Sequence, residues 1–157
     1  VAGAGMSDLN NYFQTQQDAE IVFYPLGNRN LYFSAAVTNA LQQTTDPAFK
    51  KSVFASATFG TRLGKPLWIE VYGSTGDRYN VQLHNGWEVY NEFNPVSDVL
   101  GADLLLFLPE KKLEITAGFY KSTVVSYYFY QDQEILFRNE PVKYNLINIY
   151  GGIKWNF

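Results

Sequence analysis

The chain has no cysteine and only one histidine, His84, among its 157 residues. Without cysteine it can form neither a disulfide framework nor a thiolate metal site, and a lone histidine cannot form a histidine metal cluster. No metal or other cofactor is therefore expected. No apolar run approaches the ~20 residues of a transmembrane helix, so a chain that crosses a membrane has to cross it with strands.

Charged residues are also scarce, at 17% of the chain, whereas a soluble domain carries about a quarter. The net charge of −3 and the lack of a basic cluster argue against nucleic acid as a partner. The length predicts a single domain, residues 1–157. The first residues, VAGAGM, lack the charged and apolar pattern of a secretion signal, so we expect a processed protein or the C-terminal part of a longer chain.

What the sequence does have is aromatic residues, 17% of the chain, and strands that alternate between apolar and polar residues. The clearest alternation is at the C-terminal end, residues 143–157. One face of this stretch is mainly apolar: Ile147, Ile149, Gly151, Ile153, Trp155 and Phe157. The other is mainly polar: Asn148, Tyr150, Gly152, Lys154 and Asn156, with Leu146 as its one aliphatic member. This pattern predicts a strand long enough to cross a bilayer.

The end of this strand resembles the C-terminal signal of bacterial outer-membrane β-barrel proteins. In that signal a polar residue is followed by a glycine and then by two aromatic residues, and the matching positions are Tyr150, Gly152, Trp155 and Phe157. Tyr150 is only partly polar, which is a small departure. The resemblance implies a place in the bacterial outer membrane, with its lipids, lipopolysaccharide and barrel-assembly machinery as partners. The chain also has a faint similarity to the barrel of the YaiO family.

Similar alternation recurs along the chain, at residues 19–26, 31–42, 52–63, 67–72, 99–108 and 113–120, and the small residues at 1–6 are expected to be the end of a first strand. Short turns are expected at 27–30, 64–66 and 109–112, and long loops at 7–18, 42–51, 73–98 and 130–142. Strands joined alternately by short turns and long loops predict an all-β fold, an antiparallel up-and-down transmembrane β-barrel of about eight strands, with both termini periplasmic. If the hairpin signal Asn85-Gly86 marks two more crossings, the count becomes about ten.

The polar face of the predicted strands carries mainly Ser, Thr, Ala, Gly and Tyr, with isolated charges at Glu20, Arg62, Glu70, Asp103, Glu114 and Lys154. We expect these charges to form an internal ion-pair and hydrogen-bond network, because buried charges must be paired. The uncharged face suits lipid. A barrel of about eight strands barely holds its own side chains, so no open pore is expected. A soluble ligand-binding barrel is an alternative that alternation alone does not exclude.

Two other groups of residues are candidates for function. Aromatic residues in the expected loops suit a protein-partner surface: Tyr79, Trp87, Tyr90, Phe93, Tyr127, Tyr128, Phe129 and Tyr130. His84 beside Glu88 invites a lipid-modifying activity, although the match to known barrel deacylases is poor. The sequence favours a non-enzymatic membrane scaffold or a subunit of an envelope complex. The alternatives are part of a wider pore or transporter barrel and an enzyme that modifies lipid A or phospholipids.

Overall fold

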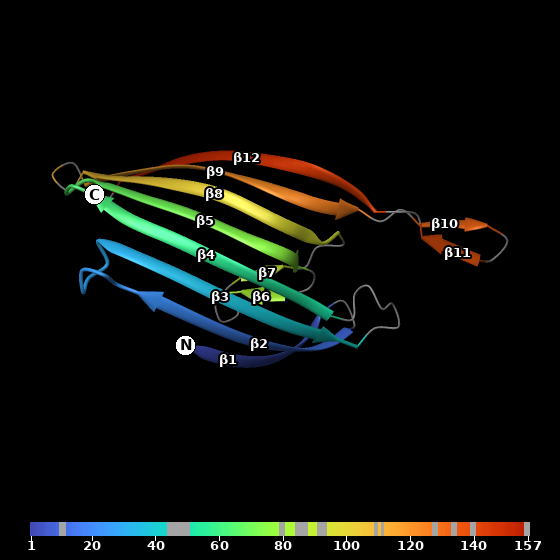
Figure 1. The fold of residues 1–157 in the computed structure, drawn as a ribbon. Coiled ribbons are helices and arrows are strands. Elements are labelled where there is room, and N and C mark those ends of the chain that lie inside the picture. Colours follow the sequence, from blue (N-terminus) through green and yellow to red (C-terminus); the bar gives the residue numbers. More distant parts are fainter. Residues whose placement is uncertain are drawn as a thin grey trace.

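The protein is all-β, and eight of its strands form one antiparallel sheet in the computed structural model (Figure 1). The structure describes residues 1–9, 12–43, 51–78, 81–83, 88–90, 94–108, 110, 112–126, 129–132, 135–138 and 141–155. The sheet strands are β1 (Ala2–Leu9), β2 (Tyr12–Phe23), β3 (Leu31–Gln42), β4 (Lys51–Leu63), β5 (Leu67–Arg78), β8 (Val96–Leu108), β9 (Leu113–Ser126) and β12 (Val142–Trp155). They lie side by side in chain order, which confirms the predicted up-and-down arrangement.

Four shorter strands form two separate hairpins. β6 (Val81–Leu83) pairs with β7 (Glu88–Tyr90), and β10 (Phe129–Asp132) pairs with β11 (Ile135–Arg138). The β10–β11 hairpin extends beyond the end of the large sheet (Figure 1). The hairpin expected around Asn85-Gly86 therefore exists as β6 and β7, but it does not join the large sheet, which has eight strands rather than ten. Within the described part of the chain, a search for membrane-spanning helices finds none.

The three short connections predicted from the sequence join β2 to β3, β4 to β5 and β8 to β9 at one end of the sheet (Figure 1). Two of them contain a glycine with positive φ, Gly27 at 65° and Gly64 at 69°. Glycine adopts this left-handed conformation without the steric cost that a Cβ brings, so both residues favour a tight reversal of the chain. β12 ends at this same end of the sheet.

Two of the expected long loops are wrong in their extent. Residues 7–18 are mostly strand, because β1 and β2 pair from Ala2 with Ala19 to Leu9 with Tyr12. β5 likewise continues to Arg78 instead of ending near Tyr72. Both faces of these extensions are mainly polar, so the sequence lacks the regular apolar–polar alternation that marks a strand there. The segments are nevertheless held by the same backbone ladder as the rest of the sheet.

The two faces of the sheet differ in burial. The inner face, to which Gln14, Thr38, Phe54 and Val124 belong, contains the most buried side chains, with Gln14 at 2% exposed and Phe54 at 4%. Alternate residues along each strand form the outer face, which is far more exposed. The packed interior of this protein is therefore largely polar, and its apolar side chains are mostly on the outside.

β1 and β12 are the two edges of the large sheet (Figure 1). Every residue of β12 is exposed, on both faces of the strand. Inner-face side chains of β12 such as Leu146 and Tyr150 remain 46% and 41% exposed, because β9 is the only strand of the described residues that lies beside β12.

Candidate functional site

The first candidate site is the outer face, where a continuous apolar belt runs across the sheet from β2 to β12. Its side chains are contributed by seven strands, from β2 to β12. They include Ile21, Phe23, Phe33, Val37, Val53, Phe59, Leu63, Ile69, Val71, Leu100, Leu104, Ile115, Phe119, Ile147, Ile149, Ile153 and Trp155. Several are highly exposed, with Ile149 at 83% and Ile21 at 74%. An exposed apolar surface that is continuous over several strands is typical of sites that contact a membrane or another protein.

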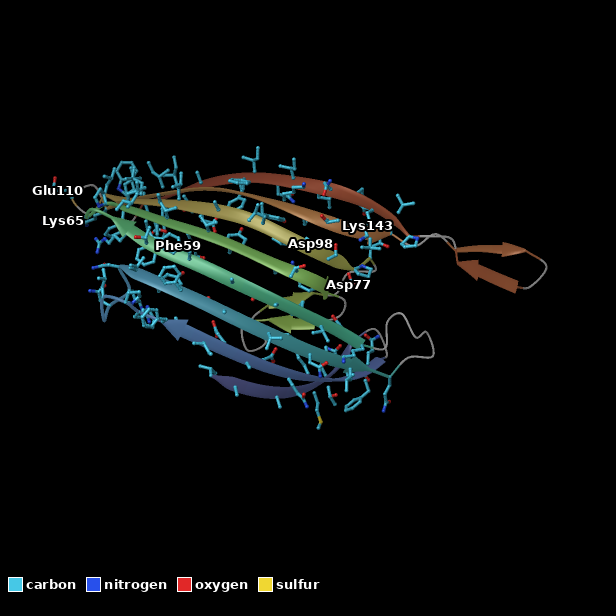
Figure 2. All side chains as sticks on the ribbon, viewed as in Figure 1. Phe59, Lys65, Asp77, Asp98, Glu110 and Lys143 are labelled. Carbon is cyan, nitrogen blue, oxygen red and sulfur yellow. The ribbon has the colours of Figure 1, made fainter. Side chains whose placement is uncertain are left out.

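Polar and charged side chains lie on both sides of the belt. Figure 2 shows Lys65 and Glu110 at the end with the short connections, and Asp77, Asp98 and Lys143 at the opposite end, with Phe59 between the two groups. On β4 the outer positions from Val53 to Leu63 carry no charge, and the preceding outer position is Lys51. The belt therefore has two defined polar borders.

The second candidate site is a row of six inner-face residues that runs across the sheet from β3 to β12. Strand register places these residues directly opposite one another, in the order Tyr32, Gly60, Glu70, Asp103, Gly118 and Tyr150. The order is the same from either end: tyrosine, glycine, carboxylate, carboxylate, glycine, tyrosine. We call this set the inner row.

Each tyrosine of the inner row lies across the neighbouring glycine and reaches the carboxylate on the strand beyond. The Tyr32 hydroxyl donates a hydrogen bond to Glu70, and the Tyr150 hydroxyl donates one to Asp103. The glycines make this possible, since a Cβ at Gly60 would lie 2.5 Å from Cζ of Tyr32. Tyr72 lies over Gly101 in the same way in the next row. Glycine here provides space for an aromatic ring.

The centre of the inner row is a pair of like charges. Glu70 and Asp103 are direct cross-strand partners, an arrangement that is unfavourable when both side chains are ionised. Each carboxylate accepts a hydrogen bond from its own tyrosine, and such charge-assisted bonds are stronger than neutral ones. The tyrosines thus help to hold two carboxylates together on the inner face.

We expect replacement of Tyr150 by phenylalanine to lower the free energy of unfolding by about 1–2 kcal/mol, because Asp103 loses its donor while the ring remains over Gly118. The matched control is Tyr144→Phe, on the same face of β12, whose hydroxyl bonds to none of the described residues. Denaturant unfolding of the two variants measures the difference. Equal effects would mean that the bond to Asp103 does not stabilise the sheet.

The other four charged residues that were expected inside the barrel lie outside the inner row. Arg62 donates from Nε to the backbone oxygen of Lys65 at 3.0 Å, at a short connection. Glu114 and Lys154 are direct cross-strand partners on β9 and β12. Glu20 is near the free end of β1, where its backbone pairs with that of Val1. Register therefore brings four of the six charges together as two pairs, Glu70 with Asp103 and Glu114 with Lys154.

The residues that resemble the C-terminal assembly signal are divided between the two faces of β12. Tyr150 and Gly152 are on the inner face, opposite Gly118 and Thr116, and Trp155 is on the outer face at 65% exposure. Phe157 lies outside the described residues.

Most of the loop candidates are also outside the described residues, namely Tyr79, His84, Trp87, Phe93, Tyr127 and Tyr128. The others belong to the small hairpins, Glu88 and Tyr90 to β7, and Phe129 and Tyr130 to β10. Both the enzymatic and the partner-surface interpretations stay predictions. Among the described residues, no group of three or more histidine, cysteine or acidic side chains could hold a metal ion.

Sequence reasoning missed the tyrosine–glycine contacts of the inner row. It placed Glu70 and Asp103 inside but expected cations as their partners. The sequence does show many tyrosines and glycines on the inward face of the strands. Which tyrosine lies over which glycine, however, depends on the register of the strands. Comparisons with models of protein families, with curated proteins and with solved structures find no match to this chain.

Proposed function

We propose that the eight-stranded sheet closes between β1 and β12 into a transmembrane β-barrel of the bacterial outer membrane. In this proposal the protein is a non-enzymatic scaffold or a subunit of a larger envelope complex. The observation that carries it is the apolar belt on the outer face, which is uncharged and exposed around seven neighbouring strands. In a bilayer this belt contacts lipid, and the exposed area no longer faces water.

The dimensions of the belt agree with a bilayer. On β4 it extends from Val53 to Leu63, ten steps of ~3.3 Å each, or about 33 Å along the strand. At the ~40° tilt typical of barrel strands this is about 25 Å of height, which is the height of the apolar band of outer-membrane barrels.

The distribution of side chains favours a membrane barrel over a soluble ligand-binding barrel. A soluble barrel keeps its apolar side chains inside and presents charge to water. Here the inner face carries the buried polar residues Gln14, Gln16 and Thr38, together with the inner row, and the aliphatic residues are outside. This inverted arrangement suits a lipid exterior and a hydrogen-bonded interior.

Closure is supported by the two exposed edges. An open edge as long as β12 presents unpaired backbone groups, which are costly in lipid and promote aggregation in water. β1 and β12 run in opposite directions, as an antiparallel closing pair requires. Pairing them satisfies both edges at once, and it covers the inner-face side chains Leu146 and Tyr150.

The outer membrane and the orientation are supported by the chain end. Tyr150, Gly152 and Trp155 match the barrel-assembly signal, and the strand that carries them ends on the side of the short connections. Short connections are periplasmic in such barrels, so both termini are assigned to the periplasm. An eight-stranded barrel filled by its own side chains has no open pore, which favours the scaffold or subunit role.

The proposal is tested by expressing the protein behind a secretion signal in a Gram-negative host and fractionating the envelope. The expected result is outer-membrane protein that stays with the membrane in urea and migrates faster on gels unheated than boiled. Co-purification in mild detergent then identifies any stoichiometric partner, and the aromatic residues of the hairpins β6–β7 and β10–β11 are the first surface to mutate. Folded protein that is soluble without detergent would contradict the proposal.

A further inference from the structure

Two lysines on the outer face of β9 and β12 stand at the border of the apolar belt. Lys121 is opposite Ile147, and Lys143 is opposite Val125, so both point to the same side of the sheet. Between them lie Thr123 and Asn145, which are opposite each other and joined by a hydrogen bond of 3.1 Å from the Thr123 hydroxyl to the Asn145 side-chain oxygen. The lysines and these two polar residues form one patch, the lysine patch.

No carboxylate among the described residues forms an ion pair with either lysine. The acidic residue nearest in register is Asp98, on the outer face opposite Thr123. Its Oδ1 accepts from the Thr75 hydroxyl at 2.8 Å and its Oδ2 from the Ser97 hydroxyl at 3.1 Å. Asp98 is thus engaged toward β5, away from β12. Within the part of the chain that the structure describes, the positive charge of the lysine patch therefore has no carboxylate partner.

The surface directly next to the lysine patch is apolar. Phe119, Ile147 and Ile149 follow on the same face, with exposures of 47%, 68% and 83%. A cationic patch followed by an exposed apolar surface on the same two strands is complementary to a lipid, with its anionic headgroup above and acyl chains below.

We propose that the lysine patch binds the phosphates of a lipid A headgroup in the leaflet at the long-connection end of the barrel. This inference rests on the proposed membrane location. The row of Lys143 is four residues from that of Lys121 along β12, or about 13 Å. A headgroup with a phosphate at each end suits this spacing better than a single phosphate does. Lysine binds phosphate as a point charge, and the Asn145 amide can donate to a headgroup oxygen.

The test uses the full chain refolded into phosphatidylcholine nanodiscs, with diphosphorylated or monophosphorylated lipid A added, and native mass spectrometry to measure lipid retention. The expected result is stronger retention of the diphosphorylated form. The double variant Lys121→Gln, Lys143→Gln should lose about 25-fold in affinity for it, since each lysine near a membrane surface contributes about a factor of five. Inorganic phosphate in excess should not compete, which separates a lipid site from a site for free anion.

The matched control is Lys51→Gln with Lys65→Gln, which removes the same charge from other parts of the surface. It should retain diphosphorylated lipid A as the unmodified protein does. An equal loss in both double variants, no loss in either, or no preference for the second phosphate would overturn the proposed site while the barrel stays folded. Failure to fold in any lipid, seen as the absence of heat-modifiable migration, would overturn the membrane assignment itself.

Discussion

Replacing Ile149 by arginine is expected to lower the free energy of unfolding from a bilayer by about 2–4 kcal/mol. Ile149 is on the outer face of β12, opposite Phe119, and is 83% exposed in the isolated chain. In the proposed barrel this position is inside the apolar belt, where a guanidinium group has to leave water for hydrocarbon. Denaturant unfolding from lipid vesicles measures the change.

Two positions on the same strand serve as controls, one for depth in the bilayer and one for the face of the sheet. Asn145 is also on the outer face but at the border of the belt, so arginine there should cost about 0–1 kcal/mol. Asn148 is on the inner face, opposite Tyr120, where a charge should cost less than at Ile149 as far as space allows. Equal penalties at Ile149 and Asn148 would contradict the assignment of the two faces, and equal penalties at Ile149 and Asn145 would contradict the belt.

Replacing Gly118 by alanine is expected to cost about 1–3 kcal/mol, although only one methyl group is added. The new Cβ would lie 2.6 Å from Cζ of Tyr150 and would also collide with the Asp103 carboxylate. Relief requires Tyr150 to leave its position over the glycine, which breaks its hydrogen bond to Asp103. The same unfolding experiment measures the loss, and valine at this position should cost more than alanine.

The matched control is Gly5→Ala on the inner face of β1, where no atom lies within 4 Å of the added Cβ. Its effect should stay within about 0.5 kcal/mol. If Gly5→Ala and Gly118→Ala are equally destabilising, the cost comes from glycine's role in the backbone rather than from the space it leaves for Tyr150.

The parts of the fold that the sequence predicts well are those where burial alternates. The β3 strand matches its expected range, 31–42, because Phe33, Ala35 and Val37 alternate with Tyr32, Ser34 and Ala36. The start of β2 was missed because Gln14, Thr15, Gln16 and Gln17 are polar on both faces. There the strand is held by the ladder and by side-chain bonds such as Thr38 to Asp18 at 2.7 Å, and neither leaves a periodic signal.

Predicting the inner row requires the register of the strands as well as the face on which each residue lies. That Glu70 and Asp103 belong to the inner face follows from alternation alone. That Tyr32 reaches Glu70 across Gly60 depends on how three strands align, which a single sequence does not encode locally. Composition alone favoured lysine or arginine as partners for these carboxylates, because buried charges are usually matched by opposite charges. Tyrosine provides the donor instead, from a strand two places away in the sheet.

Closure between β1 and β12 is the central claim, and double-cysteine cross-linking of the folded protein in lipid tests it most directly. The chain has no cysteine, so each introduced pair reports only its own proximity. Cysteine at outer-face Ala4 is combined with cysteine at each outer-face position of β12 from Ile147 to Trp155, with a short bifunctional thiol reagent. Ala4 with its register partner Gln17 is the positive control. The closed barrel predicts efficient cross-linking at one of these positions and its immediate neighbour. Cross-linking of the control pair, with none to β12, would contradict it.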